Sequence, residues 1–403
     1  MKILIVNHFP LEGSGSGSYT KNLSMFLAQR GHEVCVVLPE NDANFPRLEW
    51  VRMHPVFFTP ENGQAPANAL PFNFPCFTTH PRSNTTFAQL SAEQLDAYCE
   101  AFRTAIAQEV ERFQPDVIHG QHVWILPTLA PADIPLVVTA HGTDMMGYSK
   151  WASLRHYAEE AMQRARKVIV ISKDNQGLVE QSFPEAAKKT VFMRNGYNPM
   201  VFKPKDVNRA ELLESYGIPY AGQDVVLFAG KLTHFKGVDI LLEAASIYTK
   251  QNPNTVTVLA GHGELRSDLE HQRDELGLDS VHFIGNVSQE NLSLLYNIAD
   301  VDLVPSRREA FGLVAVEAMA CGTPVIGTNE GGLPDFVNDE VGVLVDPESP
   351  ESLASAVVAT LERVKANPTW RTKIQEYAEG NFSQSHMIDE LEAVYREAAG
   401  IKD

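Results

Sequence analysis

The chain has 403 residues, of which 44% are hydrophobic and 21% charged, and its formal net charge at pH 7 is −18. This composition is that of a globular protein and excludes a disordered or fibrous one, and the length favours two domains, since single cores stop growing near ~250–300 residues. The acidic balance argues against a general nucleic-acid-binding protein, which carries a basic surface to neutralise phosphates.

The cysteines lie in apolar contexts and show no C-x-x-C spacing; they are Cys35, Cys76, Cys99 and Cys321. We predict that they are reduced core residues and expect neither a zinc site nor a disulfide framework. The apolar run in "MKILIVNHFP" is too short for a signal peptide, and no later run approaches the length of a membrane span. We therefore expect a cytoplasmic protein without a transmembrane segment, with attachment to the inner face of the membrane as the alternative.

Strand and helix patterns alternate from the start of the chain, as in parallel α/β layers. Strand patterns in the N-terminal half lie at 2–7, 33–39, 116–119, 135–140 and 167–172, and an amphipathic helix is predicted at 18–30 after a glycine-rich turn. These elements predict one doubly wound unit.

The segment from Phe57 to Phe87 interrupts this alternation and is rich in proline, phenylalanine and asparagine. Loops of this length without secondary structure are usually functional or disordered. The aromatic content favours a partly ordered lid or an acceptor loop about as strongly as it favours disorder.

A second series of elements begins after a linker near 198–206. Its strand patterns lie at 224–230, 255–261, 281–285, 301–306, 324–327 and 342–345, and its helical patterns at 238–250, 264–276, 289–298 and 311–321. The sequence therefore predicts two Rossmann-like doubly wound α/β domains, at 1–200 and 201–380, facing an interdomain cleft where ligands of such folds collect. Residues 381–403 are predicted as a C-terminal helix; one arrangement packs it on the N-terminal domain, but the residues supply no argument for its position.

The stretch "EAFGLVAVEAMACGTPV", from Glu309 to Val325, combines a helix start with a carboxylate in apolar surroundings. Gly312 would let another group approach the backbone, and the amides at a helix N-terminus form an anion site that suits a phosphate. Glu317 lies further along the same helix, where a charged group requires a partner. A ribose diol of the same ligand would supply that partner; the alternative is a Glu317 that faces solvent or pairs with a lysine.

Two lysines, Lys231 and Lys236, flank a turn at the C-terminal end of the strand at 224–230. They offer two ammonium groups to a diphosphate, and the alternative is a pair of solvated loop lysines. The turn "LEGSGSGSYTKNL" differs from the G-x-G-x-x-G dinucleotide fingerprint, and no acidic residue is seen to end the second strand as a dinucleotide site would need. This glycine-rich turn would suit a phosphate, a sugar or a flexible surface loop.

His141 falls just past the C-terminal end of the strand at 135–140, where open α/β sheets place their reacting groups. His8 has a similar position at the end of the first strand. A lone histidine is more often structural than catalytic, so position alone does not assign either residue.

Together these stretches resemble the retaining glycosyltransferases of family four, which have the GT-B fold. "EAFGLVAVE" matches the E-x7-E signature of that family, and "GKLTHFKGVDILLEA", "LAGHGELRSDLE" and "LAQRGHEVCVV" resemble it in order and spacing. The resemblance covers nearly the whole chain and is more specific in the C-terminal half. Two departures are a lysine at Lys231, where the family usually has arginine, and "NFSQ" near the end of the chain, where a tryptophan is common.

The resemblance implies transfer of a sugar from a nucleotide diphosphate sugar, with UDP preferred over GDP as the carrier, to a hydroxyl of the acceptor. The acceptor would be a carbohydrate, a lipid-linked molecule or a small molecule, and the anomeric configuration would be retained. No cofactor and no metal are expected, because lysines take the place of the metal and the cleft motifs are read as lacking a D-x-D ligand pair.

The resemblance also implies individual roles. Glu309 would bind hydroxyls of the donor sugar, Glu317 the ribose diol, and Lys231 and Lys236 the diphosphate, while His141 would contact the donor sugar. Backbone groups would contribute the rest of the donor site, with Gly15 and Gly17 near the phosphate, Ala310, Phe311, Gly312, Leu313 and Val314 at sugar and phosphate, and Gly285, Asn286 and Val287 at the base.

Two other classes of protein remain open at this stage. One is an epimerase or phosphorylase on a similar scaffold, and the other is a non-catalytic nucleotide-sugar-binding or scaffold protein. An oxidoreductase is disfavoured because the dinucleotide fingerprint is missing.

Overall fold

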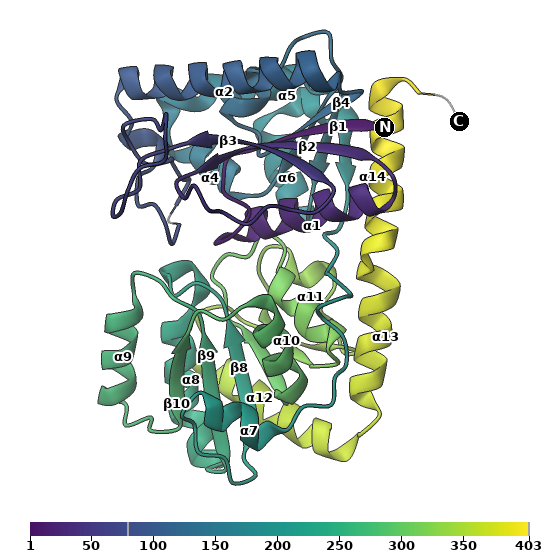
Figure 1. Ribbon diagram of the computed structural model, residues 1–403. Coiled ribbons are helices and arrows are strands. Elements are labelled where there is room, and N and C mark those ends of the chain that lie inside the picture. Colours follow the sequence, from purple (N-terminus) through teal and green to yellow (C-terminus); the bar gives the residue numbers. More distant parts are fainter. Residues whose placement is uncertain (79, 402–403) are drawn as a thin grey trace. The chain divides into compact units, whose positions relative to one another are not determined.

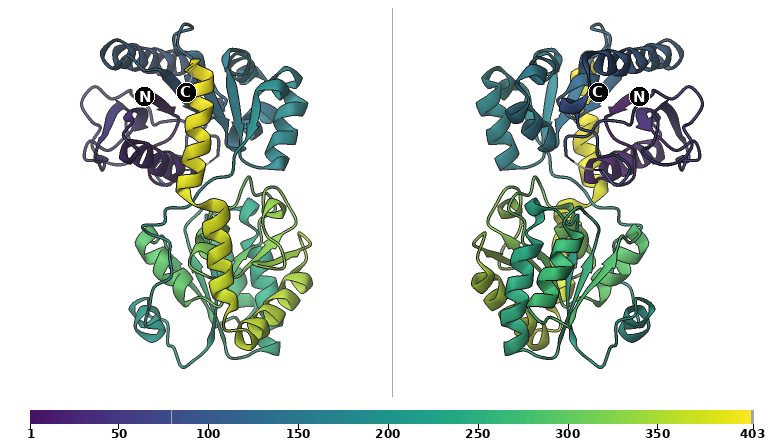
Figure 2. Two further views of the ribbon diagram at one scale, coloured as in Figure 1. Left: turned by 90° about the vertical axis from the view of Figure 1, so that its right-hand side faces the viewer. Right: turned by 90° about the vertical axis from the view of Figure 1, so that its left-hand side faces the viewer.

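The computed structural model describes residues 1–78 and 80–401, and these residues form two compact units, each built on its own parallel sheet. Unit 1 comprises residues 1–194 together with the segment from Met387 onward, and unit 2 comprises residues 195–386. The predicted α/β class of two doubly wound, Rossmann-like sheets is confirmed (Figures 1 and 2).

Unit 1 contains a seven-stranded sheet in its described residues, in the order β3-β2-β1-β4-β5-β6-β7, with neighbouring strands parallel. The strands are β1 (Lys2–Asn7), β2 (Glu33–Glu40), β3 (Val51–Phe57), β4 (Val117–Gln121), β5 (Leu136–Ala140), β6 (Lys167–Val170) and β7 (Thr190–Phe192). Most are runs of Val, Ile and Leu because helices cover both faces of a parallel sheet. The sequence analysis did not predict β3 or the three-residue β7. Strand β3 contains Pro55, which is tolerated there because β3 is an edge strand.

Helices cover the two faces of this sheet. They are α1 (Gly15–Gln29), α2 (Ala92–Phe113), α3 (Ile125–Thr128), α4 (Thr143–Lys150), α5 (Arg155–Arg164), α6 (Lys173–Ser182) and α14 (Gln384–Ala399). Buried side chains of α2, α3 and α5 share one core with the sheet, and those of α1 and α14 share the core on the opposite face. Figure 1 shows α2 and α5 on one side of the sheet and α1 on the other. The helix predicted near the C-terminal end of the chain is thus present as α14.

Helix α14 is a full partner in the second core of unit 1. Leu391 and Tyr395 are completely buried there, in the same cluster as Leu23 and Leu27 of α1. The Tyr395 hydroxyl lies 2.7 Å from Nδ1 of His119 on β4. The segment that closes this core therefore comes from the far end of the sequence (Figure 2).

The aromatic segment from Phe57 to Phe87 packs into unit 1. Phe58 and Phe74 are completely buried in the first core, and Ser83 Oγ donates to the Phe74 carbonyl at 2.7 Å. Thr79 lies outside the described residues. The alternative of a disordered loop is therefore wrong for the rest of the segment, while a role as lid or acceptor loop stays a prediction.

Unit 2 contains a six-stranded parallel sheet in its described residues, in the order β10-β9-β8-β11-β12-β13. Its strands are β8 (Asp224–Ala229), β9 (Thr255–Ala260), β10 (Val281–Gly285), β11 (Val301–Val304), β12 (Val325–Thr328) and β13 (Gly342–Val345). Its helices are α7 (Arg209–Ser215), α8 (Val238–Gln251), α9 (Arg266–Glu275), α10 (Gln289–Ile298), α11 (Leu313–Ala320), α12 (Pro350–Ala366) and α13 (Trp370–Phe382).

Every strand predicted for unit 2 is present, and local signals explain most helix ends. Ser288 caps α10 by accepting from the amide of Asn291. Helices α7, α12 and α13 were not predicted, although Ser349 and Pro350 form the cap and first residue of α12 and could have revealed it.

The described residues contain no helix that is both long and apolar enough to cross a membrane. The four cysteines are unbridged and buried, as the sequence predicts.

Candidate functional site

In unit 2, two of the predicted site residues form an ion pair. Lys236 Nζ lies 2.6 Å from Glu309 Oε2, and the same oxygen accepts a hydrogen bond from Ser306 Oγ at 3.1 Å. The Glu309 side chain is 11% exposed and that of Lys236 is 26% exposed, so the ammonium group is the more accessible partner. The sequence analysis selected both residues but did not predict that they bind one another.

Glycines allow the loops around this ion pair to approach closely. Gly237 has φ +64°, and a Cβ there would lie 2.0 Å from the carbonyl oxygen of Pro305. Gly312 has φ +100°, and a Cβ there would lie 2.6 Å from Leu333 Cδ2. The group that approaches Gly312 is therefore a leucine of the same unit, and the loop that carries Lys236 lies directly against the loop that carries Glu309.

Helix α11 begins at Leu313, later than predicted, with Gly312 as its N-cap. Glu309 thus stands in the preceding loop, and Phe311, which is 3% exposed, lies outside the helix. The first amides of any helix have no partner within it. Leu313 and Val314 are half-buried, so an anion site at this helix end remains compatible with the backbone.

Glu317, on the same helix, is 9% exposed, and burial raises its pKa to about 8. Burial is the cause of this shift, and no cationic group among the described residues contributes to it. The low exposure of Glu317 and the absence of a lysine among the causes of its pKa shift favour neither part of the alternative, a solvent-facing side chain or a lysine pair. A buried carboxyl group without a donor is costly in the unliganded protein, which leaves the ribose diol as a predicted partner.

A second buried acid, missed by the sequence analysis, lies within electrostatic reach of Glu317. Asp302 on β11 is completely buried, and neither of its carboxyl oxygens has a hydrogen-bond partner. Burial first, and then the neighbouring Glu317, raise the pKa of Asp302 well above its usual range. Burial therefore disfavours the ionised form of Asp302.

A D-x-D pair does occur in the chain, at Asp300 and Asp302, outside the motifs that the sequence analysis assigned to the cleft. Asp300 binds the Arg209 guanidinium at 2.6 and 2.9 Å and accepts from the Val225 amide at 2.8 Å. Both acids lie at the amino-terminal end of β11, whereas Glu309 follows its carboxyl end. The pair is thus structural, and the described residues hold no group of three or more His, Cys, Asp or Glu side chains arranged to hold a metal.

The other residues predicted in unit 2 follow the carboxyl ends of strands in the same sheet. Lys231 stands two residues after β8 and is half-buried. Gly285 ends β10, and Asn286 and Val287 connect it to α10, with Asn286 exposed. Because parallel strands end at one edge of a sheet, these residues share that edge with Lys236 and Glu309.

The glycines predicted in unit 1 lie inside a helix, not in the turn before it. Helix α1 begins at Gly15, and the Ser14 side chain caps it by accepting from the Gly17 amide. A Cβ at Gly17 would lie 2.3 Å from the Pro10 carbonyl oxygen, whereas a Cβ at Gly15 would meet nothing within 4 Å. Packing therefore explains glycine at 17 but gives no reason for glycine at 15.

His141 ends up in a cluster of buried polar residues in unit 1. Its Nε2 lies 2.8 Å from Gln121 Oε1, and its ring centroid lies 4.8 Å from that of His122. Burial lowers the pKa of His141 to about 3, so the imidazole is neutral. Asp144, in the first turn of α4, accepts from several backbone amides, including that of His141 at 3.3 Å. Sequence reasoning did not find Gln121, His122 or Asp144.

An acidic residue does end the second strand of unit 1, contrary to the sequence analysis. Glu40 is the last residue of β2 and is 2% exposed. Arg82 binds its two carboxyl oxygens at 2.8 and 3.2 Å. The carboxylate is thus engaged by the aromatic segment, and the missing glycine fingerprint remains the argument against a dinucleotide site.

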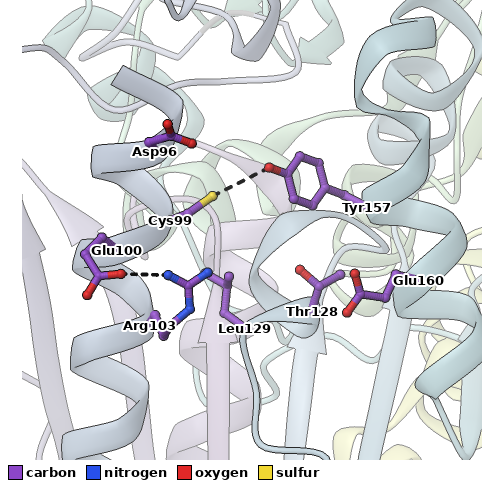
Figure 3. A pocket seen from close by; sticks show the side chains of 8 residues that line it. All are labelled: Asp96, Cys99, Glu100, Arg103, Thr128, Leu129, Tyr157 and Glu160. Atoms are coloured by element: carbon purple, nitrogen blue, oxygen red, sulfur yellow. Dashed lines mark hydrogen bonds and ion pairs between the residues drawn. The ribbon is translucent and has the colours of Figure 1, made fainter. Parts of the chain in front are cut away.

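A cavity of about 480 Å³ lies in unit 1 between α2, α3 and α5 (Figure 3). Its lining residues are Asp96, Cys99, Glu100, Arg103, Thr128, Leu129, Tyr157 and Glu160. Three of them are acids, and the arginine already binds Glu100 at 2.7 Å. This lining would repel a diphosphate, so the cavity is a poor candidate for the predicted donor.

Comparison with known families gives two matches. Residues 214–380 match the family described as glycosyl transferases group 1, and residues 13–200 match glycosyltransferase family 4. A D-inositol 3-phosphate glycosyltransferase of Saccharomonospora viridis is 32% identical over 340 residues, which cover 77% of this chain and 78% of that protein. An uncharacterized glycosyltransferase of Methanocaldococcus jannaschii is 29% identical over 410 residues, covering 97% and 96% of the two chains.

Solved structures share the fold at lower identity. The HepE protein of Anabaena, in complex with UDP and glucose, aligns with a TM-score of 0.76 and 21% identity over 98% of this chain and all of that one. Sucrose-phosphate synthase from Thermosynechococcus elongatus aligns with a TM-score of 0.75 and 23% identity over the whole of both chains. Because these identities are low, they show the architecture alone.

Proposed function

The chain belongs to the group 1 and family 4 glycosyltransferases of the GT-B fold, and on that premise we propose that it transfers a sugar from a nucleotide diphosphate sugar to an acceptor hydroxyl with retention of configuration. The observation that carries the proposal is the Lys236–Glu309 ion pair. This pair joins two loops just ahead of the N-terminus of α11. UDP is the preferred carrier, in keeping with the UDP complex of HepE. The acceptor remains a carbohydrate, a lipid-linked molecule or a small molecule.

In this proposal the diphosphate binds at Lys236, Lys231 and the first amides of α11. An ammonium group has three donors, so Lys236 can keep its bond to Glu309 and still donate to a phosphate oxygen. Glu309 would then bind hydroxyls of the sugar, and Glu317 the ribose diol. Gly15, Gly17 and His141 belong to unit 1, and their contacts with the donor remain predictions from the family resemblance.

The chemical step replaces the bond between the anomeric carbon and the phosphate oxygen by a bond to the acceptor oxygen. The acceptor hydroxyl attacks from the side of the leaving group, and its proton passes to the departing phosphate. Negative charge develops on that phosphate, so fixed cationic and amide donors lower the barrier by stabilising the leaving group. The two lysines and the α11 amides would supply this stabilisation, and no carboxylate nucleophile is invoked.

The first test is a ligand screen. A ligand that binds only the native state raises the melting temperature, by an amount that corresponds to about 2.7 kcal/mol at a concentration of 100 Kd. We expect UDP or a UDP sugar to raise it more than the GDP or ADP equivalents do.

Incubation with acceptor and analysis of the products would then separate a transferase from an epimerase, which needs no acceptor, and from a binding protein, which leaves the donor intact. If none of the nucleotides changed the melting temperature, the proposal would fail.

A second prediction concerns Lys236→Ala. The change removes the ammonium group that is proposed to bind the diphosphate. We expect binding of the nucleoside diphosphate to weaken at least tenfold, because one charge-assisted hydrogen bond contributes roughly 1.5–3 kcal/mol. Calorimetric titration would measure the affinity. Lys250→Ala is the matched control, since Lys250 is an exposed lysine at the end of α8 in the same unit. Equal affinity in the two variants would remove Lys236 from the diphosphate site.

A further inference from the structure

Arg307, which the sequence analysis did not single out, ties together three loops at the carboxyl edge of the unit 2 sheet. Its guanidinium binds both carboxyl oxygens of Asp239 at 2.7 Å and those of Glu348 at 2.5 and 3.0 Å. It also donates to the carbonyl oxygen of His234 at 2.8 Å. The side chain is 13% exposed, and all three of its nitrogens are engaged.

The Arg307–Asp239 pair joins the same two segments as the Lys236–Glu309 pair. Arg307 and Glu309 lie in the loop after β11, while Lys236 and Asp239 lie just before and just inside the start of α8. The two pairs have opposite polarity, so a slip of one segment along the other would bring like charges together. A backbone bond from the Arg307 amide to the Phe235 carbonyl, at 2.9 Å, fixes the same register.

The third loop contributes Glu348 in a strained conformation. Its φ is +57°, in the left-handed region that non-glycine residues avoid at a cost of roughly 1–2 kcal/mol. Such conformations persist only where the surroundings support them, and the Glu348 side chain is bound here by Arg307. Asp239 is the second carboxylate that Arg307 binds. Partial burial acts to raise the pKa of Asp239, but the hydrogen bonds and charge of Arg307 outweigh burial and lower it.

We propose that Arg307 is a positioning residue for the donor: through Asp239, Glu348 and the His234 carbonyl it holds the Lys236 loop where the ammonium can meet Glu309 and a diphosphate together. This inference rests on the proposed function, because it explains the bonds of Arg307 by their effect on the proposed donor site. Arg307 itself need not touch the donor. Lysine cannot replace it, because an ammonium group lacks the planar fork that binds two carboxylates bidentately.

The test uses the full chain and the variant Arg307→Lys, which keeps the charge and loses the fork. Calorimetric titration would compare UDP with UMP, and GDP with GMP, on both proteins. We expect the diphosphate that binds the wild type to bind Arg307→Lys about tenfold more weakly, while the monophosphate affinity stays within twofold. Arg308→Lys is the matched control, since Arg308 is the exposed neighbour in the same loop, and its affinities should equal those of the wild type.

The outcomes separate the two proposals. If no nucleoside diphosphate bound the wild type, the proposed function would fall and this inference with it. If the wild type bound a diphosphate and Arg307→Lys bound it equally well, the positioning role alone would be overturned. An equal loss of affinity for the diphosphate and the monophosphate would also overturn it, because that result would indicate a general change in the structure of unit 2.

A second variant covers the case in which Arg307→Lys does not fold. Glu348→Gln keeps the size of the side chain and one acceptor oxygen but removes the charge that Arg307 binds. We expect a smaller loss of diphosphate affinity, about threefold, again without a change for the monophosphate. Diphosphate affinity equal to that of the wild type would count against the positioning role.

Discussion

Glu309→Ala is expected to lower the rate of sugar transfer at least a hundredfold, while the protein remains folded. The change removes the proposed contact with the sugar hydroxyls and the anionic partner that holds Lys236, 2.6 Å away. Groups that stabilise a transition state at fixed positions typically contribute 10²–10³-fold each. Because the Lys236 side chain is 26% exposed, water can solvate the freed ammonium, and we expect a loss of stability of only about 1 kcal/mol.

Initial rates with the identified donor and acceptor, together with a thermal melt, would measure both effects. Glu340→Ala is the control, because Glu340 is an exposed carboxylate of the same unit and should change neither rate nor melting temperature. A Glu309→Ala protein with the transfer rate of the wild type would exclude this residue from the mechanism.

Glu317→Gln is expected to make the unliganded protein more stable above pH 7 and to weaken nucleotide binding at the same time. Burial raises the pKa of Glu317 to about 8, so ionising this carboxyl group in the folded state is unfavourable. A neutral amide of the same shape avoids that cost. It cannot offer a carboxylate to the ribose diol, so we expect the affinity for the nucleoside diphosphate to fall about tenfold or more.

The sign of the pH dependence follows from linkage. A carboxyl group whose pKa is higher in the folded state than in the unfolded state makes folding less favourable as the pH rises between the two values. For Glu317 this window runs from about pH 4.5 to about pH 8. Within it, the free energy of unfolding of the wild type should fall by up to about 1.4 kcal/mol per pH unit on account of this residue.

Urea unfolding at pH 5, 6.5 and 8 would measure this slope. The slope should be shallower in Glu317→Gln, and other buried groups with shifted pKa values, among them Asp302 and Asp144, contribute to the part that remains. Saturating nucleotide should stabilise the wild type more than the variant at pH 8. Parallel pH profiles for the two proteins would show that Glu317 does not titrate in this window.

The sequence predicts most of the fold because its signals are local. Runs of Val, Ile and Leu mark the strands that are buried on both faces, and caps such as Ser288 mark helix starts. The same logic fails at β3, where Pro55 breaks the pattern, and at the glycine-rich turn, where the Ser14 cap starts α1 earlier than expected. Local rules therefore fix the elements but leave their ends uncertain by a few residues.

The candidate site depends on partners that are distant in sequence. Glu309 and Lys236 are 73 residues apart, and Arg307 and Asp239 are 68 apart. The residues could be selected by type and by their place after a strand, but no local pattern says which carboxylate meets which cation. The same limit applies to Asp302, which falls within an apolar strand pattern and is seen as an unpartnered acid only once the sheet is assembled.

The place of α14 in unit 1 has a consequence for synthesis in the cell. The polypeptide leaves the ribosome from its N-terminus, so residues 1–194 emerge before the whole of unit 2, and α14 follows only after residue 383. At a synthesis rate of roughly 5–20 residues per second, the delay between the emergence of residue 194 and that of α14 is about 10–40 s. During that interval the core that contains Leu23 and Leu27 lacks the six buried residues that α14 contributes to it, which makes this incomplete core a natural target for chaperones.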